Sequence, residues 1–119
     1  MIHIAEEKNY ENKIKEWLES NGIYPLGCPI QVIKHPPIGY YVKRWGGGLY
    51  VKSGLPDMQI VVHGKCIEIE IKASKGKPSL LQEIICKQIN DSGGCARIVY
   101  PKDFESLKIL IKEYIGNGK

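Results

Sequence analysis

Residues 57–72 read DMQIVVHGKCIEIEIK, and this stretch determines how the rest of the sequence is interpreted. It contains two short apolar runs, from about Asp57 to Val62 and from about Cys66 to Lys72. Both are rich in β-branched residues and are therefore typical of strands. The residues between them, His63-Gly64-Lys65, are polar and include a glycine, which favours a turn. We therefore predict a β-hairpin.

The second strand of this hairpin alternates charged residues with isoleucines. Side chains two residues apart lie on the same face of a strand, so Glu68, Glu70 and Lys72 share one face. The opposite face carries the three isoleucines that can fill a core, Ile67, Ile69 and Ile71. Asp57 opens the neighbouring strand, which allows its carboxylate to come close to that of Glu70.

Outward from the hairpin, hydrophobic periodicity and turn residues define the remaining elements. They are a helix from Ala5 to about Asn21, an irregular connection from Ile23 to Pro37, a strand from Gly39 to Trp45, a helix opened by Ser79, a strand from Ala96 to Tyr100 and a helix from about Asp103 to Ile115. The order is α-β-β-β-α-β-α, which packs as a three-layer α/β domain with a central mixed sheet flanked by helices. We expect the strand from Ala96 to lie parallel to a hairpin strand, because the helix between them can form the crossover.

The length and composition bound the class of protein. With 119 residues the chain has the size of one domain, which we place at residues 1–119. Its 43% hydrophobic and 25% charged residues are typical of a globular protein. No apolar run approaches the roughly 20 residues that span a bilayer, so we expect a cytoplasmic protein with no membrane partner. The four cysteines form no CxxC pair and are expected to be free thiols: Cys28, Cys66, Cys86 and Cys95.

Basic residues gather in the middle third of the sequence, although the formal net charge of +4 is mild. Lysine and arginine clusters attract phosphate backbones. We predict DNA contacts for five of these residues: Lys43, Arg44, Lys52, Lys75 and Lys77. A solvated basic face would give the same pattern, and the sequence does not separate the two interpretations.

The combination of Asp57, Glu70 and Lys72 suits the hydrolysis of phosphodiester bonds. Mg²⁺ prefers oxygen ligands and keeps several waters, so one or two carboxylates plus a substrate phosphate complete its site. A bound ion stabilises charge on the phosphate and lowers the pKa of a bound water. Lys72 could orient or help to deprotonate the attacking water. The alternative is a strand whose polar face is simply wet; we favour the chemical interpretation because Asp57 follows a proline on the neighbouring strand.

Five short motifs follow one another along nearly the whole chain. They are Tyr10-Glu11-Asn12-Lys13-Ile14, Gly54-Leu55-Pro56-Asp57, Glu70-Ile71-Lys72, Lys77-Pro78-Ser79-Leu80-Leu81-Gln82 and Gly93-Gly94-Cys95-Ala96. This ordered set resembles the PD-(D/E)xK nuclease superfamily and, in detail, its virus-type replication-repair branch, the VRR-NUC domains. The resemblance implies a restriction-endonuclease-like fold.

The resemblance also implies a role for each residue of the central motifs. Asp57 and Glu70 would be metal ligands together with the backbone carbonyl of Ile71, and Lys72 would be the catalytic lysine. The implied cofactor is Mg²⁺, for which Mn²⁺ is expected to substitute.

Two further residues match the family but have alternative explanations. Glu11 matches a first-helix glutamate that joins the metal site, and its position close to the apolar stripe of the helix would be costly for an unpaired carboxylate. An acidic residue is also favoured near a helix N-terminus. Gln82 matches a helix-opening glutamine near the active site, but Ser79-x-x-Gln82 is also a capping box. We leave these alternatives open.

The expected function is metal-dependent DNA endonuclease activity, selective for branched structures such as Holliday junctions or flaps. By similarity it would act in DNA repair, recombination or phage replication, in a bacterial or phage-infected cytoplasm. A homodimer would let two sites meet two strands of a twofold junction. The alternatives are a DNA-binding module that does not cleave and a nuclease directed at RNA.

Overall fold

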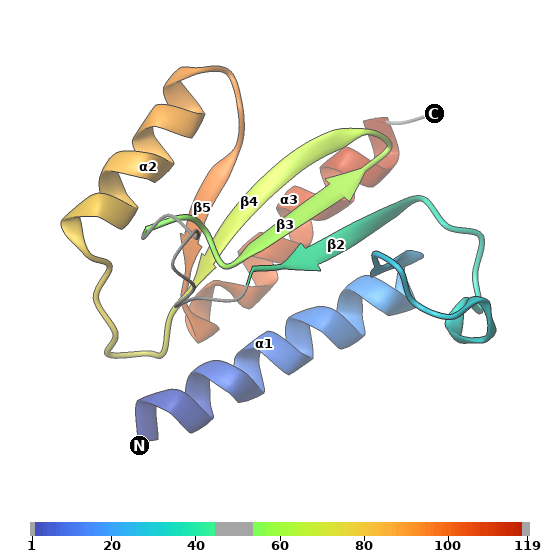
Figure 1. Ribbon diagram of the computed structural model, residues 1–119, viewed down its shortest axis with the longest axis horizontal. Coiled ribbons are helices and arrows are strands. Elements are labelled where there is room, and N and C mark those ends of the chain that lie inside the picture. Colours follow the sequence, from blue (N-terminus) through green and yellow to red (C-terminus); the bar gives the residue numbers. More distant parts are fainter. Residues whose placement is uncertain (1, 45–53, 118–119) are drawn as a thin grey trace.

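The computed structural model describes residues 2–44 and 54–117. Its elements are α1 (Ile2–Ser20), β1 (Ile23–Pro25), η1 (Ile30–Val32), β2 (Gly39–Lys43), β3 (Met58–Val62), β4 (Lys65–Ile71), α2 (Leu80–Asp91), β5 (Ala96–Val99), η2 (Pro101–Asp103) and α3 (Phe104–Asn117). The predicted α/β class, with a central mixed sheet flanked by helices, is confirmed (Figure 1). Within these ranges, no helix is long and apolar enough to cross a membrane.

The five strands follow their sequence order across the sheet, β1-β2-β3-β4-β5. The outer pairs, β1 with β2 and β4 with β5, are parallel, and the two inner pairings are antiparallel. The predicted parallel pairing of the strand from Ala96 is therefore confirmed, and α2 forms its crossover (Figure 1).

The central hairpin turns on His63 and Gly64, which both have positive φ angles, of 50° and 80°. Two such residues form the tight turn whose twist matches the flanking strands. Lys65 therefore already belongs to β4, which runs from Lys65 to Ile71. Both ends lie one residue earlier than the predicted bounds, Cys66 and Lys72. The register pairs Met58 with Ile69. One step further along, Asp57 lies opposite Glu70.

The hydrophobic core lies between the isoleucine face of β4 and the helices α1 and α3. Its fully buried members include Ile14, Leu18, Ile67, Ile69, Ile71 and Ile111. The prediction that the isoleucines fill the core is confirmed. The polar face of β4 is buried as well, with Glu68 8% and Glu70 3% exposed. The alternative of a wet polar face is therefore wrong, and Gln82 of α2 contacts Glu70 on this face.

The connection from Ile23 to Pro37 was predicted to be irregular, and this is wrong at its start. Residues 23–25 form β1, which makes the sheet five-stranded and adds a strand to the predicted order. So short a strand exists because it pairs with β2, an interaction that local sequence cannot show. The predicted end of the following strand, at Trp45, lies outside the described residues.

Candidate active site

Three hydrogen bonds hold Asp57 and the preceding Pro56 at the start of β3. The backbone N–H of Ile71 donates to Asp57 Oδ2 at 2.8 Å. The backbone N–H of Arg44 donates to the Asp57 carbonyl at 2.7 Å, and the Arg44 guanidinium donates to the Pro56 carbonyl at 2.9 Å. Pro56 itself is fully buried. Packing of the proline and the two hydrogen bonds from Arg44 therefore both hold the Pro-Asp turn. The carboxylate of Asp57 is thus tied directly to the end of β4.

Glu70 points from β4 into the layer between the sheet and α2. Its Oε2 accepts a hydrogen bond from Gln82 Nε2 at 3.1 Å and lies 3.5 Å from Lys72 Nζ. Its Oε1 is buried and has no hydrogen-bond partner among the described residues. A buried carboxylate oxygen without a partner is costly. It is the kind of atom that a cation would satisfy.

Burial and the charge of Asp57 oppose the ionisation of Glu70. Burial raises the pKa of Glu70, and the negative charge of Asp57 raises it further, while Lys72 acts in the opposite direction. Two carboxylates that share a buried site cannot both ionise cheaply. A divalent cation would remove this conflict by neutralising both groups.

Glu11 lies in α1 and is neutralised by lysines. Its two oxygens pair with Lys8 at 3.1 Å, with Lys15 at 2.8 Å and with Lys43 at 2.8 Å. Burial alone would raise the pKa of Glu11, but the hydrogen bonds from these three lysines outweigh burial and lower it to about 2. Lys43 Nζ also lies 3.9 Å from Asp57 Oδ1. The structure therefore connects Glu11 to Asp57 through an ammonium group.

The metal-ligating side chains do not converge in a group of three. Among residues 2–44 and 54–117, no three His, Cys, Asp or Glu side chains are placed to hold a metal ion together. The structure brings together Asp57, Glu70, Lys72 and Gln82. Glu11 is connected to this group only through Lys43. The predicted role of Glu11 as a metal ligand remains a prediction.

Glu7 is a neighbour of the site that the sequence did not reveal. It is half-buried on α1, one helical turn before Glu11. Burial raises the pKa of Glu7, the negative charge of Asp57 raises it further, and Lys72 and Lys43 lower it. Its spacing of four residues from Glu11 places both on one face of the helix, and this spacing was the available signal.

Gln82 satisfies both of the interpretations left open by its motif. Its side-chain oxygen accepts from the Ser79 backbone N–H at 2.8 Å, and its own N–H donates to Ser79 Oγ at 3.1 Å. This reciprocal pair is the capping box at the start of α2. The amide nitrogen remains free to donate to Glu70. The cap and the contact with the site are therefore made by one side chain.

Arg44, predicted to contact DNA, is bound to a buried carboxylate. Its guanidinium makes a bidentate pair with Glu68, whose Oε2 also accepts from Gln59 Nε2 at 3.1 Å. This cluster lies on the same face of β4 as Glu70. Arg44 links it to the Pro-Asp turn through its hydrogen bond to the Pro56 carbonyl. Contact of Arg44 with phosphate remains a prediction.

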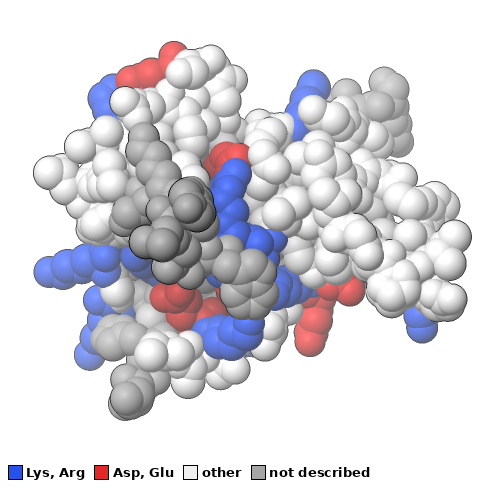
Figure 2. Space-filling view, viewed as in Figure 1, with Lys and Arg blue, Asp and Glu red and all other residues white. Residues whose placement is uncertain are grey.

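The other residues predicted to contact DNA have different surroundings. Lys75 and Lys77 are exposed and line a hollow of about 740 Å³, together with Ser74, which follows Lys72 by two residues. Lys43 pairs with Glu11, and Lys52 lies outside the described residues. In Figure 2, basic and acidic side chains lie side by side near the middle of the face shown. Charge of both signs is therefore concentrated in one region.

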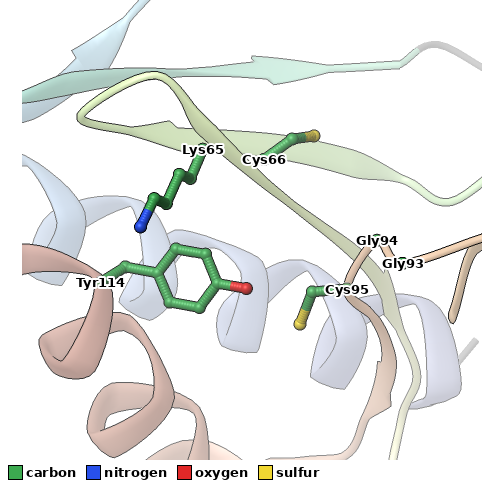
Figure 3. A pocket seen from close by; sticks show the side chains of 6 residues that line it. All are labelled: Lys65, Cys66, Gly93, Gly94, Cys95 and Tyr114. Atoms are coloured by element: carbon green, nitrogen blue, oxygen red, sulfur yellow. The ribbon is translucent and has the colours of Figure 1, made fainter. Parts of the chain in front are cut away.

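A separate hollow of about 470 Å³ lies at the other end of β4 (Figure 3). Tyr114 points toward Cys95 in this hollow, while the sulfur of Cys66 points away from both. Burial raises the pKa of Tyr114, and the neighbouring Cys95 raises it further. All four cysteines are free thiols, as predicted. Nothing in this hollow brings carboxylates together, so the candidate site remains at the opposite end of β4.

No model of a known protein family matches the chain, and no curated protein matches its sequence closely. The resemblance to VRR-NUC domains therefore rests on the motifs quoted above, and the assignment of a function rests on the geometry of Asp57, Glu70 and Lys72.

Proposed function

We propose that this chain is a metal-dependent nuclease that hydrolyses phosphodiester bonds in DNA. The observation that carries the proposal is the pair formed by Asp57 and Glu70. Their carboxylates are held on adjacent strands, one oxygen of Glu70 is buried without a partner among the described residues, and Lys72 lies beside it. Burial and the negative charge of Asp57 both raise the pKa of Glu70, so the ionised pair is costly unless a cation lies between the two carboxylates.

The residues fit a hard divalent cation such as Mg²⁺ or Mn²⁺. Asp57 and Glu70 would hold it, and the family resemblance adds the backbone carbonyl of Ile71. Two carboxylates suffice, because magnesium sites are usually completed by water and substrate phosphate. When bound, the ion would stabilise charge on the phosphate and lower the pKa of a bound water.

The chain's own side chains would position the reacting groups. Lys72 Nζ, 3.5 Å from Glu70, would neutralise a phosphate oxygen and orient the attacking water. Gln82 would hold Glu70 in place through its hydrogen bond to Oε2. The hydrogen bond from the Ile71 N–H to Asp57 would fix the distance between the two strands at the site.

The substrate and assembly follow from the family resemblance. Branched DNA, such as a Holliday junction or a flap, is the expected substrate in repair, recombination or phage replication. A homodimer would place two sites on two strands of a twofold junction. The setting would be the cytoplasm of a bacterial or phage-infected cell.

Incubation of the purified protein with labelled blunt duplex, flap and four-way-junction DNA, and with matching RNA, tests the proposal. We expect cleavage of a branched DNA in Mg²⁺ or Mn²⁺ and none in EDTA. Absence of metal-dependent product from every substrate would overturn the proposal. Tight binding that needs no metal and yields no product would instead indicate a DNA-binding module, and cleavage of RNA alone would reassign the substrate.

A further inference from the structure

We propose that the hollow beside Lys72 is a groove that binds an unpaired nucleic-acid strand next to the phosphate being cut. The inference rests on the proposed nuclease function and specifies its substrate. The hollow measures about 740 Å³, and its lining residues are Ser74, Lys75, Gly76, Lys77, Tyr100 and Lys102. Two of these lysines were predicted to contact DNA, but the opposite wall, formed by Tyr100 and Lys102, was not.

Both walls of the groove begin at the candidate active site. The backbone N–H of Lys72 donates to the Val99 carbonyl at 3.0 Å, so the ends of β4 and β5 lie side by side there. Ser74 follows Lys72 by two residues, and Tyr100 follows Val99 directly. The two segments that line the groove therefore begin next to Lys72 and its hydrogen-bond partner Val99.

The first wall is held in place by hydrogen bonds. Ser74 donates from its backbone N–H to Glu6 Oε1 at 2.6 Å and from its hydroxyl to Glu6 Oε2 at 3.0 Å. The backbone N–H of Gly76 donates to the Ala73 carbonyl at 2.9 Å. These bonds fix the segment that carries Lys75 and Lys77. Both carboxylate oxygens of Glu6 accept hydrogen bonds from Ser74.

Within residues 2–44 and 54–117, the lysines that line the groove make no ion pair. Lys75, Lys77 and Lys102 are exposed. In the part of the chain that the structure describes, none of the three lies within 4 Å of a carboxylate oxygen. Rows of ammonium groups bind phosphate backbones by releasing condensed counterions.

Tyr100 gives the groove an aromatic surface. Its ring is half-buried, and Lys102 Nζ lies 5.9 Å from the ring centroid. The Asp103 carboxylate accepts from the Tyr100 backbone N–H at 2.9 Å and fixes the turn that presents the ring. A cationic groove with an aromatic side chain is the combination that binds single strands, because every base can stack on a ring. A paired duplex offers its phosphates but not the faces of its bases.

Fluorescence anisotropy with a labelled single-stranded oligonucleotide, a flap duplex and a blunt duplex tests the groove. Binding is measured in EDTA over a range of KCl concentrations, for wild type and for a triple variant with Lys75→Ala, Lys77→Ala and Lys102→Ala. The matched control carries three substitutions of exposed lysines outside the groove, Lys34→Ala, Lys65→Ala and Lys112→Ala.

Each phosphate contact on a single strand contributes about 0.7 to the slope of log affinity against log salt, so loss of three should reduce the slope by about 2. We expect this loss in the groove variant and not in the control. Tyr100→Ala should weaken single-strand binding roughly tenfold through lost stacking, and Tyr100→Phe should retain it. An unchanged slope in the groove variant would overturn the proposal, as would an equal loss for blunt duplex and single strand.

A small diester separates failure of the groove from failure of the proposed function. Bis(4-nitrophenyl) phosphate with Mn²⁺ can reach the metal site without occupying the groove. We expect the groove variant to hydrolyse it at the wild-type rate, while Lys72→Ala does not. If wild type fails to hydrolyse the ester or any DNA, but the salt slope still falls in the groove variant, the groove stands and the nuclease function does not.

Discussion

Replacing Glu11 with glutamine should destabilise the fold more than any other change of one carboxylate on α1. Glu11 is 4% exposed and pairs with three lysines, which lower its pKa from the ordinary 4.5 to about 2. A pKa difference of about 2.5, at about 1.4 kcal/mol per pKa unit, gives roughly 3 kcal/mol. This value is an upper bound, because the side chain of Lys8 is 54% exposed and solvent screens its share.

The pH dependence of this stabilisation has a definite sign. A carboxylate whose pKa is lower in the folded state stabilises the fold above its unfolded value, here about 4.5, and the stabilisation is lost as pH falls toward about 2. Urea denaturation from pH 7 to pH 2 should therefore show a gap between wild type and Glu11→Gln that is constant above about pH 5 and closes in acid. Glu16→Gln, an exposed change on the same helix, is the matched control.

Two results would refute this reasoning. One is a loss of stability in Glu11→Gln no larger than in Glu16→Gln. The other is a gap that persists unchanged at pH 2. A titration with Mg²⁺ then separates the two roles of Glu11. Stabilisation by Mg²⁺ that survives in Glu11→Gln assigns this residue to the lysine cluster, and its loss assigns Glu11 to the metal site.

Three further predictions concern the residues around the site. Glu70→Gln should equal or exceed wild type in melting temperature in EDTA above about pH 5. The pKa of Glu70 is raised in the folded state, so as pH rises the carboxyl group ionises more readily in the unfolded chain, and wild type loses stability. Scanning fluorimetry should also show that this variant loses stabilisation by Mg²⁺. Arg44→Ala should lower the free energy of unfolding in urea by about 3 kcal/mol, because Glu68 would stay buried without the guanidinium that pairs with it. Arg44→Lys should restore only part of this stability, because lysine cannot make a bidentate pair. A loss below about 1 kcal/mol in Arg44→Ala would contradict the reasoning. Ser79→Ala should cost about 1 kcal/mol through the lost cap of α2 and leave cleavage intact, whereas Gln82→Ala should lower both stability and the cleavage rate, because only Gln82 also contacts Glu70.

The sequence predicted the parts of the fold that depend on local pattern. The alternation in β4 and the polar stretch His63-Gly64-Lys65 predicted the hairpin, but the structure shows a turn of two residues, His63 and Gly64, with Lys65 already in β4. A three-residue turn would have placed Asp57 opposite Ile71, so its alignment with Glu70 was established by the structure. The sequence therefore predicted that Asp57 and Glu70 come close on neighbouring strands, but not which residues pair.

The remaining features depend on contacts between distant segments. β1 is a strand because it pairs with β2, and Arg44 finds its partner Glu68 24 residues away. Glu7 approaches Asp57 because of the way α1 packs against the sheet, which helical periodicity does not specify. The lysines around Glu11 include Lys43 from β2, so its charge environment could not be deduced from α1 alone.

Single-turnover cleavage of a branched DNA tests the central claim most directly. The rates of wild type, Lys72→Ala and Lys65→Ala are compared in Mg²⁺ and in EDTA; Lys65 lies on the same strand as Glu70, at the end away from the site. We predict a loss of about a hundredfold or more for Lys72→Ala, as expected for removal of a group that acts on the transferred proton or charge. Lys65→Ala should cut at the wild-type rate, and no variant should cut in EDTA. Cleavage by Lys72→Ala at the wild-type rate, or cleavage that persists in EDTA, would contradict the account.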